Sequence, residues 1–326
     1  MKNLVLLALL IGIACQPTKS KQEPTSRSWE TVASEDGSKP IARHEAAFVE
    51  VGNKFYLLGG RGILPTSIYD VKKGVWTEGA KPPIELHHFQ PIVYENKIYV
   101  IGALTGGYPT ETPTSNMFIY DPEKDSWEIG PEIPKERRRG STGNVLVGDK
   151  VLIACGIKNG HVGDHKKWLD SYSFKTGEWE VLPDAPRARD HFQAILANNK
   201  VYLAGGRNSS APENPFSNTI AEVDVYDIKS QTWNTLEKNL PTKRAGNMAV
   251  LFQEDILVIG GESDTQVIAH SEVEGLDIMT GTWKSYPSLN RGRHGSGIAV
   301  HERTLYTVSG SGNRGGEPEL ESLEKF

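Results

Sequence analysis

Cysteine is scarce in this chain, and its scarcity limits the ways in which the fold can be held together. The 326 residues include two cysteines, Cys15 and Cys155. Cys15 directly follows an N-terminal targeting segment, so the body of the chain is left with one thiol and no internal disulfide is expected. Cys155 replaces a glycine in an apolar run, which is typical of a small buried side chain rather than a reactive one.

An excess of positive charge is also missing. The chain has 36 Lys and Arg residues against 41 Asp and Glu, which gives a formal net charge of −5. Proteins that bind nucleic acid need a basic footprint to neutralise phosphates. We therefore expect no nucleic-acid partner, and we expect no cofactor.

Long apolar runs are missing except at the N-terminus. Leu4–Ala14 follows Lys2 and is too short to span a bilayer as a helix. We predict a signal peptide over residues 1–14. Ala14-Cys15 resembles a bacterial lipoprotein cleavage site, in which Cys15 becomes the lipidated first residue of the mature chain. Cleavage without a lipid is the alternative, because Gly12 stands where Leu is usual.

The segment after this site is polar. Residues 15–27 are rich in Lys, Ser, Thr, Gln and Pro, which is typical of a flexible tether. The prediction for localisation is therefore the bacterial cell envelope, with the lipid on Cys15 as the only membrane contact, or the periplasm or a secreted state.

The rest of the chain contains one repeated stretch. Asn199–Gly206 reads Asn-Lys-Val-Tyr-Leu-Ala-Gly-Gly, an alternating apolar run that ends in two small residues. Alternation with β-branched and aromatic residues predicts a strand. The same register returns at roughly 50-residue spacing, which indicates a repeat architecture. Its further copies are Asn53–Gly60, Asn96–Ala103, Asp149–Gly156, Asp255–Gly261 and Thr304–Gly310.

Each copy belongs to a predicted unit of four antiparallel strands. A strand precedes the copy across a short polar turn, which is typical of a hairpin. A third strand ending in Tyr or Leu follows, and Trp comes seven residues later in a fourth strand. The Tyr or Leu and Trp pairs are Tyr69 and Trp76, Tyr120 and Trp127, Tyr172 and Trp179, Tyr226 and Trp233, and Leu276 and Trp283.

The sixth unit lacks its fourth strand. Glu319–Leu323 aligns with Glu272–Leu276, so the Trp of this unit would fall just beyond Phe326. An unassigned strand of the right type, Ser28–Val32, lies at the other end of the chain. We predict that it completes the last unit, so that three C-terminal strands and one N-terminal strand close a ring and no sheet edge is left open.

These motifs resemble the kelch family. The Gly-Gly doublet, the Tyr and the Trp seven residues later are the signature of that family, with Leu276 and Leu323 replacing the Tyr in the last two units. The resemblance implies an all-β, six-bladed kelch β-propeller over residues 28–326. We expect it to be monomeric.

Candidate functional residues lie on one face of this propeller. Loops between second and third strands vary in length and share a face with the links between blades, and function collects where loops differ on a rigid frame. Five arginines occupy one register of the links, and arginine suits carboxylate, sulfate and phosphate groups. The alternative is that these arginines bind backbone carbonyls of the next blade. The ligand-binding candidates are Arg43, Arg139, Arg189, Arg244 and Arg293 from this register and the irregular Arg61, His87, His88, His191 and Arg207.

One loop contains three residues that could bind a metal. His161, Asp164 and His165 have a spacing that suits a metal. A polar loop with no further ligand nearby is usually solvated, so the sequence predicts no metal.

Two functions are consistent with these residues. The first is a non-enzymatic binding module that recognises a glycan or a protein through the loop face. The alternative is a sugar mutarotase or epimerase, because N-acetylneuraminate epimerases are secreted six-bladed kelch proteins and Gly261-Glu262 is similar to their motif. That resemblance implies a general acid/base role for Glu262. The Arg that should follow is absent from Ser263–His270. The sequence favours the first function over an enzyme.

Overall fold

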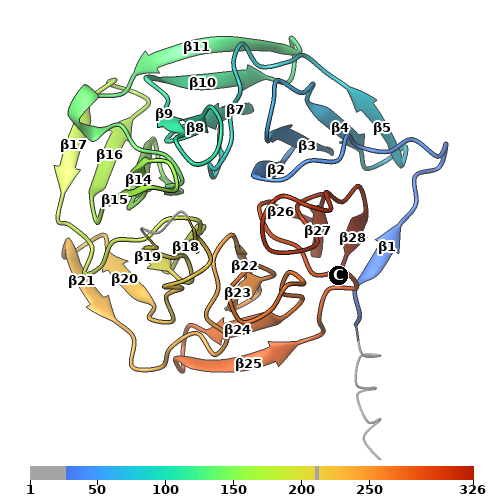
Figure 1. The fold of residues 1–326 in the computed structure, drawn as a ribbon. Coiled ribbons are helices and arrows are strands. Elements are labelled where there is room, and N and C mark those ends of the chain that lie inside the picture. The colour runs from blue at the N-terminus through green and yellow to red at the C-terminus, as the bar shows by residue number, and fades with distance from the viewer. Residues whose placement is uncertain (1–26, 210–212) are drawn as a thin grey trace, which may run out of the picture.

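The computed structural model describes residues 27–209 and 213–326, which form a ring of six four-stranded antiparallel sheets (Figure 1). The predicted all-β, six-bladed propeller is confirmed. The predicted signal peptide, Cys15 and almost all of the tether lie outside the described residues. No helix of the described residues is long and apolar enough to cross a membrane.

The strands of blades one to five run outward from the axis in chain order. Blade one comprises β2 (Ala46–Val51), β3 (Lys54–Gly59), β4 (Ser67–Asp70) and β5 (Val75–Glu78). Blade two comprises β6 (Ile92–Tyr94), β7 (Lys97–Val100), β10 (Asn116–Asp121) and β11 (Ser126–Glu132). Blade three comprises β12 (Gly143–Val147), β13 (Lys150–Ala154), β16 (Leu169–Ser173) and β17 (Trp179–Leu182).

The second half of the ring repeats this plan. Blade four comprises β18 (Ala194–Ala197), β19 (Lys200–Leu203), β20 (Asp224–Asp227) and β21 (Thr232–Thr235). Blade five comprises β22 (Met248–Phe252), β23 (Asp255–Ile259), β24 (Val273–Asp277) and β25 (Thr282–Tyr286). Blade six comprises β26 (Ile298–His301), β27 (Thr304–Val308), β28 (Leu323–Lys325) and, outermost, β1 (Glu30–Val32).

Three short elements lie outside the six sheets. The loops of blades two and three each contain a small hairpin, and a single 3-10 turn precedes blade three. They are β8 (Leu104–Thr105) with β9 (Thr112–Pro113), β14 (Ile157–Asn159) with β15 (Gly163–His165), and η1 (Lys135–Arg137).

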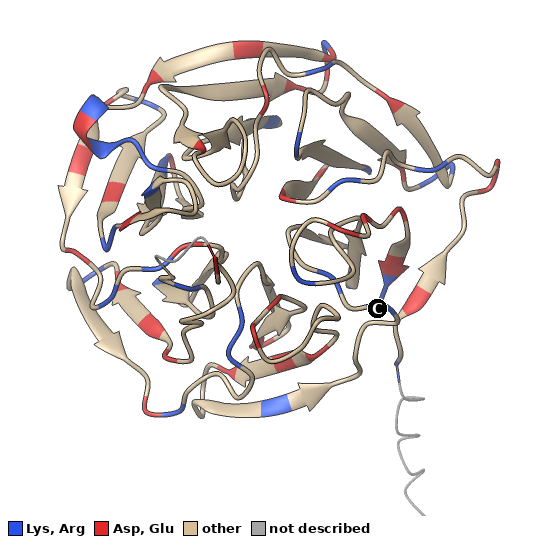
Figure 2. Cartoon of the chain, in the orientation of Figure 1, with Lys and Arg blue, Asp and Glu red and all other residues tan. Residues whose placement is uncertain are grey.

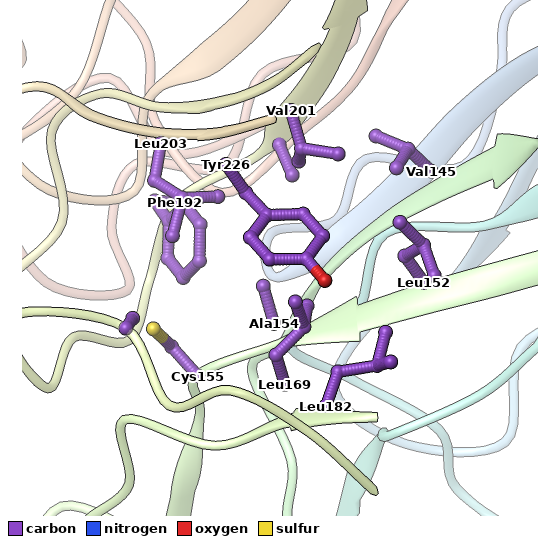
Figure 3. Packing of buried hydrophobic residues seen from close by; sticks show 12 residues of the cluster. Val145, Leu152, Ala154, Cys155, Leu169, Leu182, Phe192, Val201, Leu203 and Tyr226 are labelled. Carbon is purple, nitrogen blue, oxygen red and sulfur yellow. The ribbon is translucent and has the colours of Figure 1, made fainter. Parts of the chain in front are cut away.

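The core consists of apolar clusters between neighbouring blades. Between blades three and four, for example, Leu152 and Leu169 meet Val201 and Tyr226 (Figure 3). Cys155 lies in the same cluster and is fully buried, and burial raises the pKa of its thiol to about 11. The thiol therefore stays protonated at neutral pH, in agreement with the small buried side chain predicted from the sequence.

The ring is closed by strands from the two ends of the chain, as predicted. β1 pairs antiparallel with β28, with Glu30 opposite Lys325 and Val32 opposite Leu323. On its other side β28 pairs with β27, and Phe326 extends that pairing through two backbone hydrogen bonds with Leu305.

The predicted alignment of the sixth blade is wrong by three residues. Leu305 corresponds to Ile256 of blade five, and Ile256 lies opposite Leu276. Phe326, not Leu323, therefore occupies the aromatic position of blade six. Its ring packs against Trp29 with centroids 5.4 Å apart, as Tyr120 packs against Trp127 at 5.3 Å.

A hydrogen-bonded belt surrounds the axis at one end of the innermost strands. Its six residues have φ between 51° and 62°, and they are Glu45, His88, Ser141, His191, Gly246 and Gly295. The amide of His88 donates to the Glu45 carbonyl at 3.0 Å, and that of Ser141 donates to the His88 carbonyl at 2.8 Å. The Ser141 hydroxyl accepts from the His191 amide at 2.8 Å.

The other half of the belt consists of backbone bonds and returns to blade one. The amides of Gly246, Gly295 and Ala46 donate in turn to the carbonyls of His191, Gly246 and Gly295. Glycine suits the left-handed backbone here, and a Cβ on Gly295 would lie 2.8 Å from the Glu45 nitrogen. Glu45, His88 and His191 adopt the same backbone with large side chains, at a conformational cost of about 1–3 kcal/mol each. Such costs concentrate at functional sites.

Ring closure gives the first testable prediction. Trp29→Ala should lower the free energy of unfolding by about 3–5 kcal/mol, because a buried indole is lost together with its contact to Phe326. Urea denaturation followed by circular dichroism measures this change. Trp233→Ala is the control, since it removes a half-buried indole that takes no part in closure. A loss under about 0.5 kcal/mol for Trp29→Ala would contradict the docking of β1, because buried aromatic truncations cost far more.

Candidate functional site

All six blades line one cavity at the mouth of the central channel, on the face formed by the variable loops. Its volume is about 590 Å³. Acidic, basic and imidazole side chains predominate in its wall, together with two aromatic rings. The lining residues are His44, Glu45, Arg61, Glu85, His88, Gly107, Tyr108, His161, Arg207, Glu213, Pro215, Phe216, Glu262, His294, Gly315 and Gly316.

A second cavity of about 40 Å³ is lined by all six belt residues and shares Glu45 and His88 with the larger one. The Gln90 amide nitrogen donates to the Ala194 carbonyl, and its oxygen accepts from the amides of Asn144 and Ala194. Gln193 similarly links blade four to Ser296 of blade six. The bonds from Gln90 to Ala194 and from Gln193 to Ser296 join blades that are not neighbours, which stiffens the floor of the site.

The irregular candidates from the sequence gather at this mouth. Arg61, His88, Arg207 and Glu262 line the large cavity, and His191 lines the smaller one beneath it. His87 is buried behind His88, and their Nδ1 atoms lie 2.5 Å apart. The structure therefore brings together residues from five parts of the chain that the sequence lists only as separate candidates.

Arg61 begins one chain of charge-assisted contacts. Its guanidinium donates to Glu111 Oε1 at 2.6 Å, across the interface between blades one and two. His161 Nδ1 lies 3.0 Å from the same oxygen and 3.1 Å from Glu111 Oε2. Burial opposes ionisation of Glu111, but the hydrogen bonds from His161 and Arg61 outweigh it and hold the pKa of this carboxyl well below its usual range.

Arg207 begins a second chain. Its Nη1 donates to Glu262 Oε1 at 2.8 Å, and its Nη2 donates to His191 Nε2 at 2.9 Å. Glu262 Oε2 accepts from the Gly315 amide at 2.8 Å and lies 3.3 Å from His294 Nε2. Burial would raise the pKa of Glu262, but the charges of His294 and Arg207 lower it overall. Glu262 is therefore an ionised carboxylate held against an arginine.

Arg207 also supplies what the local sequence around Glu262 lacks. Ser263–His270 contains no arginine, and the arginine that pairs with Glu262 comes from the preceding blade. The two side chains meet because each follows the small pair at the end of the second strand of its blade. Sequence spacing within one repeat cannot show a contact made across repeats.

The five arginines of the link register do not reach the cavity. Arg43, Arg189, Arg244 and Arg293 are completely buried and Arg139 is 3% exposed. Arg43 donates to the carbonyls of Gly59 and Pro65 in the blade that follows it. The prediction that these arginines form a ligand-binding ring is therefore wrong. They are internal braces that bind backbone carbonyls, which is the alternative given in the sequence analysis.

Four of these arginines pair with an acid two residues before the aromatic position of the third strand. The pairs are Arg139 with Asp170, Arg189 with Asp224, Arg244 with Glu274 and Arg293 with Glu324. In blade one the acid is replaced by Ser67, whose hydroxyl accepts from Arg43. Blade two replaces both partners by Leu86 and Phe118, which share an apolar cluster. The braces thus vary as matched pairs from blade to blade.

The loop considered as a metal site does not converge on itself. Asp164 pairs with Lys166, and His165 Nε2 lies 3.5 Å from Asp190 Oδ2. His161 instead lies against two histidines from other repeats, with ring centroids 5.2 Å from His88 and 5.0 Å from His191.

Three buried acidic residues of the site are absent from the candidates named from the sequence. Glu45 occupies the belt position two residues after Arg43, so the register that located the arginines could have located it. Glu111 lies in an irregular loop, and nothing in its spacing marks it. Asp190 stands beside His191 and lies 3.3 Å from its Nδ1.

The fold and the charged mouth define a kelch-type β-propeller with a cavity lined by charged and aromatic side chains on its axis. Both signs of charge are spread over the blades of the ring (Figure 2). A family model described as the Attractin/LZTR1 beta-propeller matches residues 19–267, and the chain belongs to this family.

Individual relatives are similar over different shares of their length. Kelch-like protein terF of Aspergillus terreus is 29% identical over 321 residues, 93% of this chain and 68% of terF. Alpha-scruin of Limulus polyphemus is 28% identical over 194 residues, 55% of this chain and 20% of scruin. The solved structure titled "Structure of YjhT" superposes with a TM-score of 0.73 at 15% identity, covering 87% of this chain and 95% of that one. At this identity the likeness to YjhT concerns the fold alone.

The matched braces give the second prediction. Arg244→Leu should lower the free energy of unfolding by about 3–5 kcal/mol, because it leaves Glu274 without its buried partner. The double variant Arg244→Leu/Glu274→Phe reproduces the apolar pair of blade two and should lose clearly less than the two single variants added together. Urea denaturation of all three variants measures the coupling. Simple additivity would show that the pair is not a unit.

Proposed function

We propose that this propeller binds a small hydroxyl-rich molecule, of the carbohydrate class, in the cavity at the mouth of its channel. The observation that carries this proposal is the cavity itself. Its volume of about 590 Å³ lies within the roughly 300–1,000 Å³ of small-ligand sites, and charged side chains surround it on all sides. The proposal therefore places glycan recognition in this cavity rather than elsewhere on the loop face.

The chemistry of the wall supports a polyol. Carboxylates such as Glu45 and Glu262 accept hydrogen bonds from hydroxyl groups, and Arg61 donates them. Tyr108 is 52% exposed at the rim, and its ring offers an apolar face to a sugar ring. Phe216 lines the same cavity, with the guanidinium of Arg314 5.4 Å from its ring centroid. Aromatic faces and ionised groups in one cavity match the two faces of a sugar.

A second candidate is a sugar mutarotase that uses Glu262. It is favoured by one contact, the 2.8 Å bond between Glu262 and Arg207, because this pair combines a proton acceptor with a group that binds a carboxylate. An ionised Glu262 can accept the proton of an anomeric hydroxyl as a general base. Its lowered pKa makes the opposite role, that of a general acid at neutral pH, unfavourable.

One set of NMR measurements tests both candidates. We expect saturation transfer from the protein to N-acetylneuraminic acid or to a neutral aldose. Glu262→Gln should weaken this binding roughly 10-fold, since it removes a charge-assisted acceptor while keeping the shape. Glu302→Gln is the matched control, because Glu302 lies in the exposed turn between β26 and β27, away from the cavity wall.

The same samples report catalysis through the exchange rate of the sugar anomers. Acceleration that disappears in Glu262→Gln would favour the mutarotase, and binding without acceleration favours the binding module. Absence of both for every sugar would contradict the carbohydrate proposal and leave a protein partner on the loop face.

We also propose that Cys15 carries a lipid that anchors the chain to the bacterial envelope. The support is the sequence of the first fifteen residues, in which the positively charged Lys2 is followed by the apolar run Leu4–Ala14 and then by Cys15. Expression of the full chain in a bacterium fed an alkyne-labelled fatty acid should give a labelled protein, and Cys15→Ser should abolish the label. Persistence of the label in Cys15→Ser would contradict the anchor. A processed but unlabelled wild type would favour simple cleavage.

A further inference from the structure

Three histidines from three different repeats converge where the large cavity meets the belt. His88 and His191 are belt residues, and His161 comes from the turn of the β14–β15 hairpin. One ring nitrogen of each lies within 4.8 Å of those of the other two, and all three side chains are buried. The ring centroids are 4.6–5.2 Å apart and the planes are steeply inclined, so the rings meet through edges and faces rather than by stacking.

The hydrogen bonds around His88 decide which of its nitrogens is free. His87 Nε2 lies 3.0 Å from the Gly106 carbonyl and 3.5 Å from Arg61 Nη1. We assign the His87 proton to Nε2, because the carbonyl is the nearer group and can only accept. His87 Nδ1 is then an acceptor, and His88 Nδ1 must donate to it. The lone pair of His88 therefore lies on Nε2. Among the described residues this buried atom makes no hydrogen bond, and the nearby Glu45 Oε2, at 3.3 Å, cannot donate to it when ionised.

The same reasoning applies to the other two rings. His161 Nδ1 faces the Glu111 carboxylate at 3.0 Å and donates to it, which leaves the lone pair on Nε2. His191 Nε2 accepts from Arg207, since a guanidinium only donates, and its Nδ1 faces Asp190 Oδ1 at 3.3 Å. Each imidazole thus has polar atoms near Nδ1 and its lone pair on Nε2, and for His191 these atoms are Asp190 Oδ1 and the Ser141 hydroxyl, each 3.3 Å from Nδ1. This is the arrangement by which carboxylates and other partners orient metal-binding histidines.

The charge around the histidines also favours a cation. Four buried carboxylates surround the cluster, and they are Glu45, Glu111, Asp190 and Glu262. Two guanidinium groups, Arg61 and Arg207, oppose them. With neutral histidines the group carries an excess of two negative charges, which a divalent cation would balance.

We propose that His88, His161 and His191 bind one divalent transition-metal ion, with Zn²⁺ as the representative ion, and leave a coordination position facing the cavity. Three neutral imidazoles suit Zn²⁺ and its first-row neighbours rather than Mg²⁺ or Ca²⁺, which prefer oxygen. Three protein ligands with an open position are typical of sites that bind a further ligand through the metal.

Arg207 has a defined part in this proposal. Its guanidinium donates to His191 Nε2, the atom that would bind the ion. On metal binding it gives up that bond and keeps its ion pair with Glu262. The open position then faces a cavity lined by Glu45 and Arg61. A hydroxyl or carboxylate oxygen of a cavity ligand can bind there, but the metal site itself does not depend on the proposed carbohydrate.

The test uses the full chain without an affinity tag, treated with a chelator and then titrated with Zn²⁺ alone by calorimetry. We expect one ion per chain and a higher midpoint of thermal unfolding when the ion is bound. Substitution of Co²⁺ should give the visible absorption bands of a nitrogen-rich site with few ligands. Since no sugar is present, failure here leaves the carbohydrate proposal untouched, and failure of sugar binding leaves this one untouched.

Variants assign the ion to this cluster. His161→Ala should weaken Zn²⁺ binding by more than the roughly 10–100-fold lost when an outer partner of a ligand is removed. His301→Ala is the matched control, because His301 pairs with Glu50 on β2, away from the cluster, and it should bind as the wild type does. His191→Gln is a second variant that keeps a hydrogen-bonding side chain at the belt position, and circular dichroism checks that each variant is folded.

Several results would overturn the proposal. They are the lack of saturable binding by the wild type, a Co²⁺ spectrum unchanged in folded His161→Ala and His191→Gln, and equal weakening in His301→Ala.

Discussion

The structure depends on the closure of one hydrogen-bonded belt about the central axis. Six residues with left-handed backbone, one at the entrance of each blade, pass hydrogen bonds from blade to blade until the last returns to the first. Blade six contributes Gly295 to this belt, and its outermost strand comes from the N-terminal end. Apolar packing between blades supplies the stability. The belt fixes where each blade presents its first side chain to the channel.

This arrangement explains why stability and function separate within single repeats. In the link before blade four, Arg189 points away from the axis and pairs with Asp224 inside the blade, whereas His191, two residues on, belongs to the belt. The first residue serves the fold and the second lines the channel. Neighbouring positions of one link thus have opposite environments, and a count of charges along the link cannot distinguish them.

Much of the fold could be predicted from sequence because each blade repeats its own rules. The alternating runs, the small pairs and the Trp spacing predict six blades, and they predict that the N-terminal strand β1 completes the last one. The alignment of blade six is wrong because Glu319–Leu323 locally resembles Glu272–Leu276, whereas the pairing of the strands places Phe326, not Leu323, in the aromatic position. The site is harder to predict because its contacts cross repeats. Arg207 meets Glu262 and His161 meets His88 over separations that no local motif records, and only the acids that accompany the aromatic positions could have shown that the arginines are braces.

The belt also bears on how such a molecule can change over evolutionary time. Its six positions share one backbone geometry, yet two hold glycine while the others hold Glu45, His88, Ser141 and His191. A replacement at one position alters a single wall and leaves the remaining five where they are. A ring built by duplication of one blade can therefore acquire different side chains at its six belt positions through single substitutions. The chemistry of the channel can then diverge while the fold stays the same.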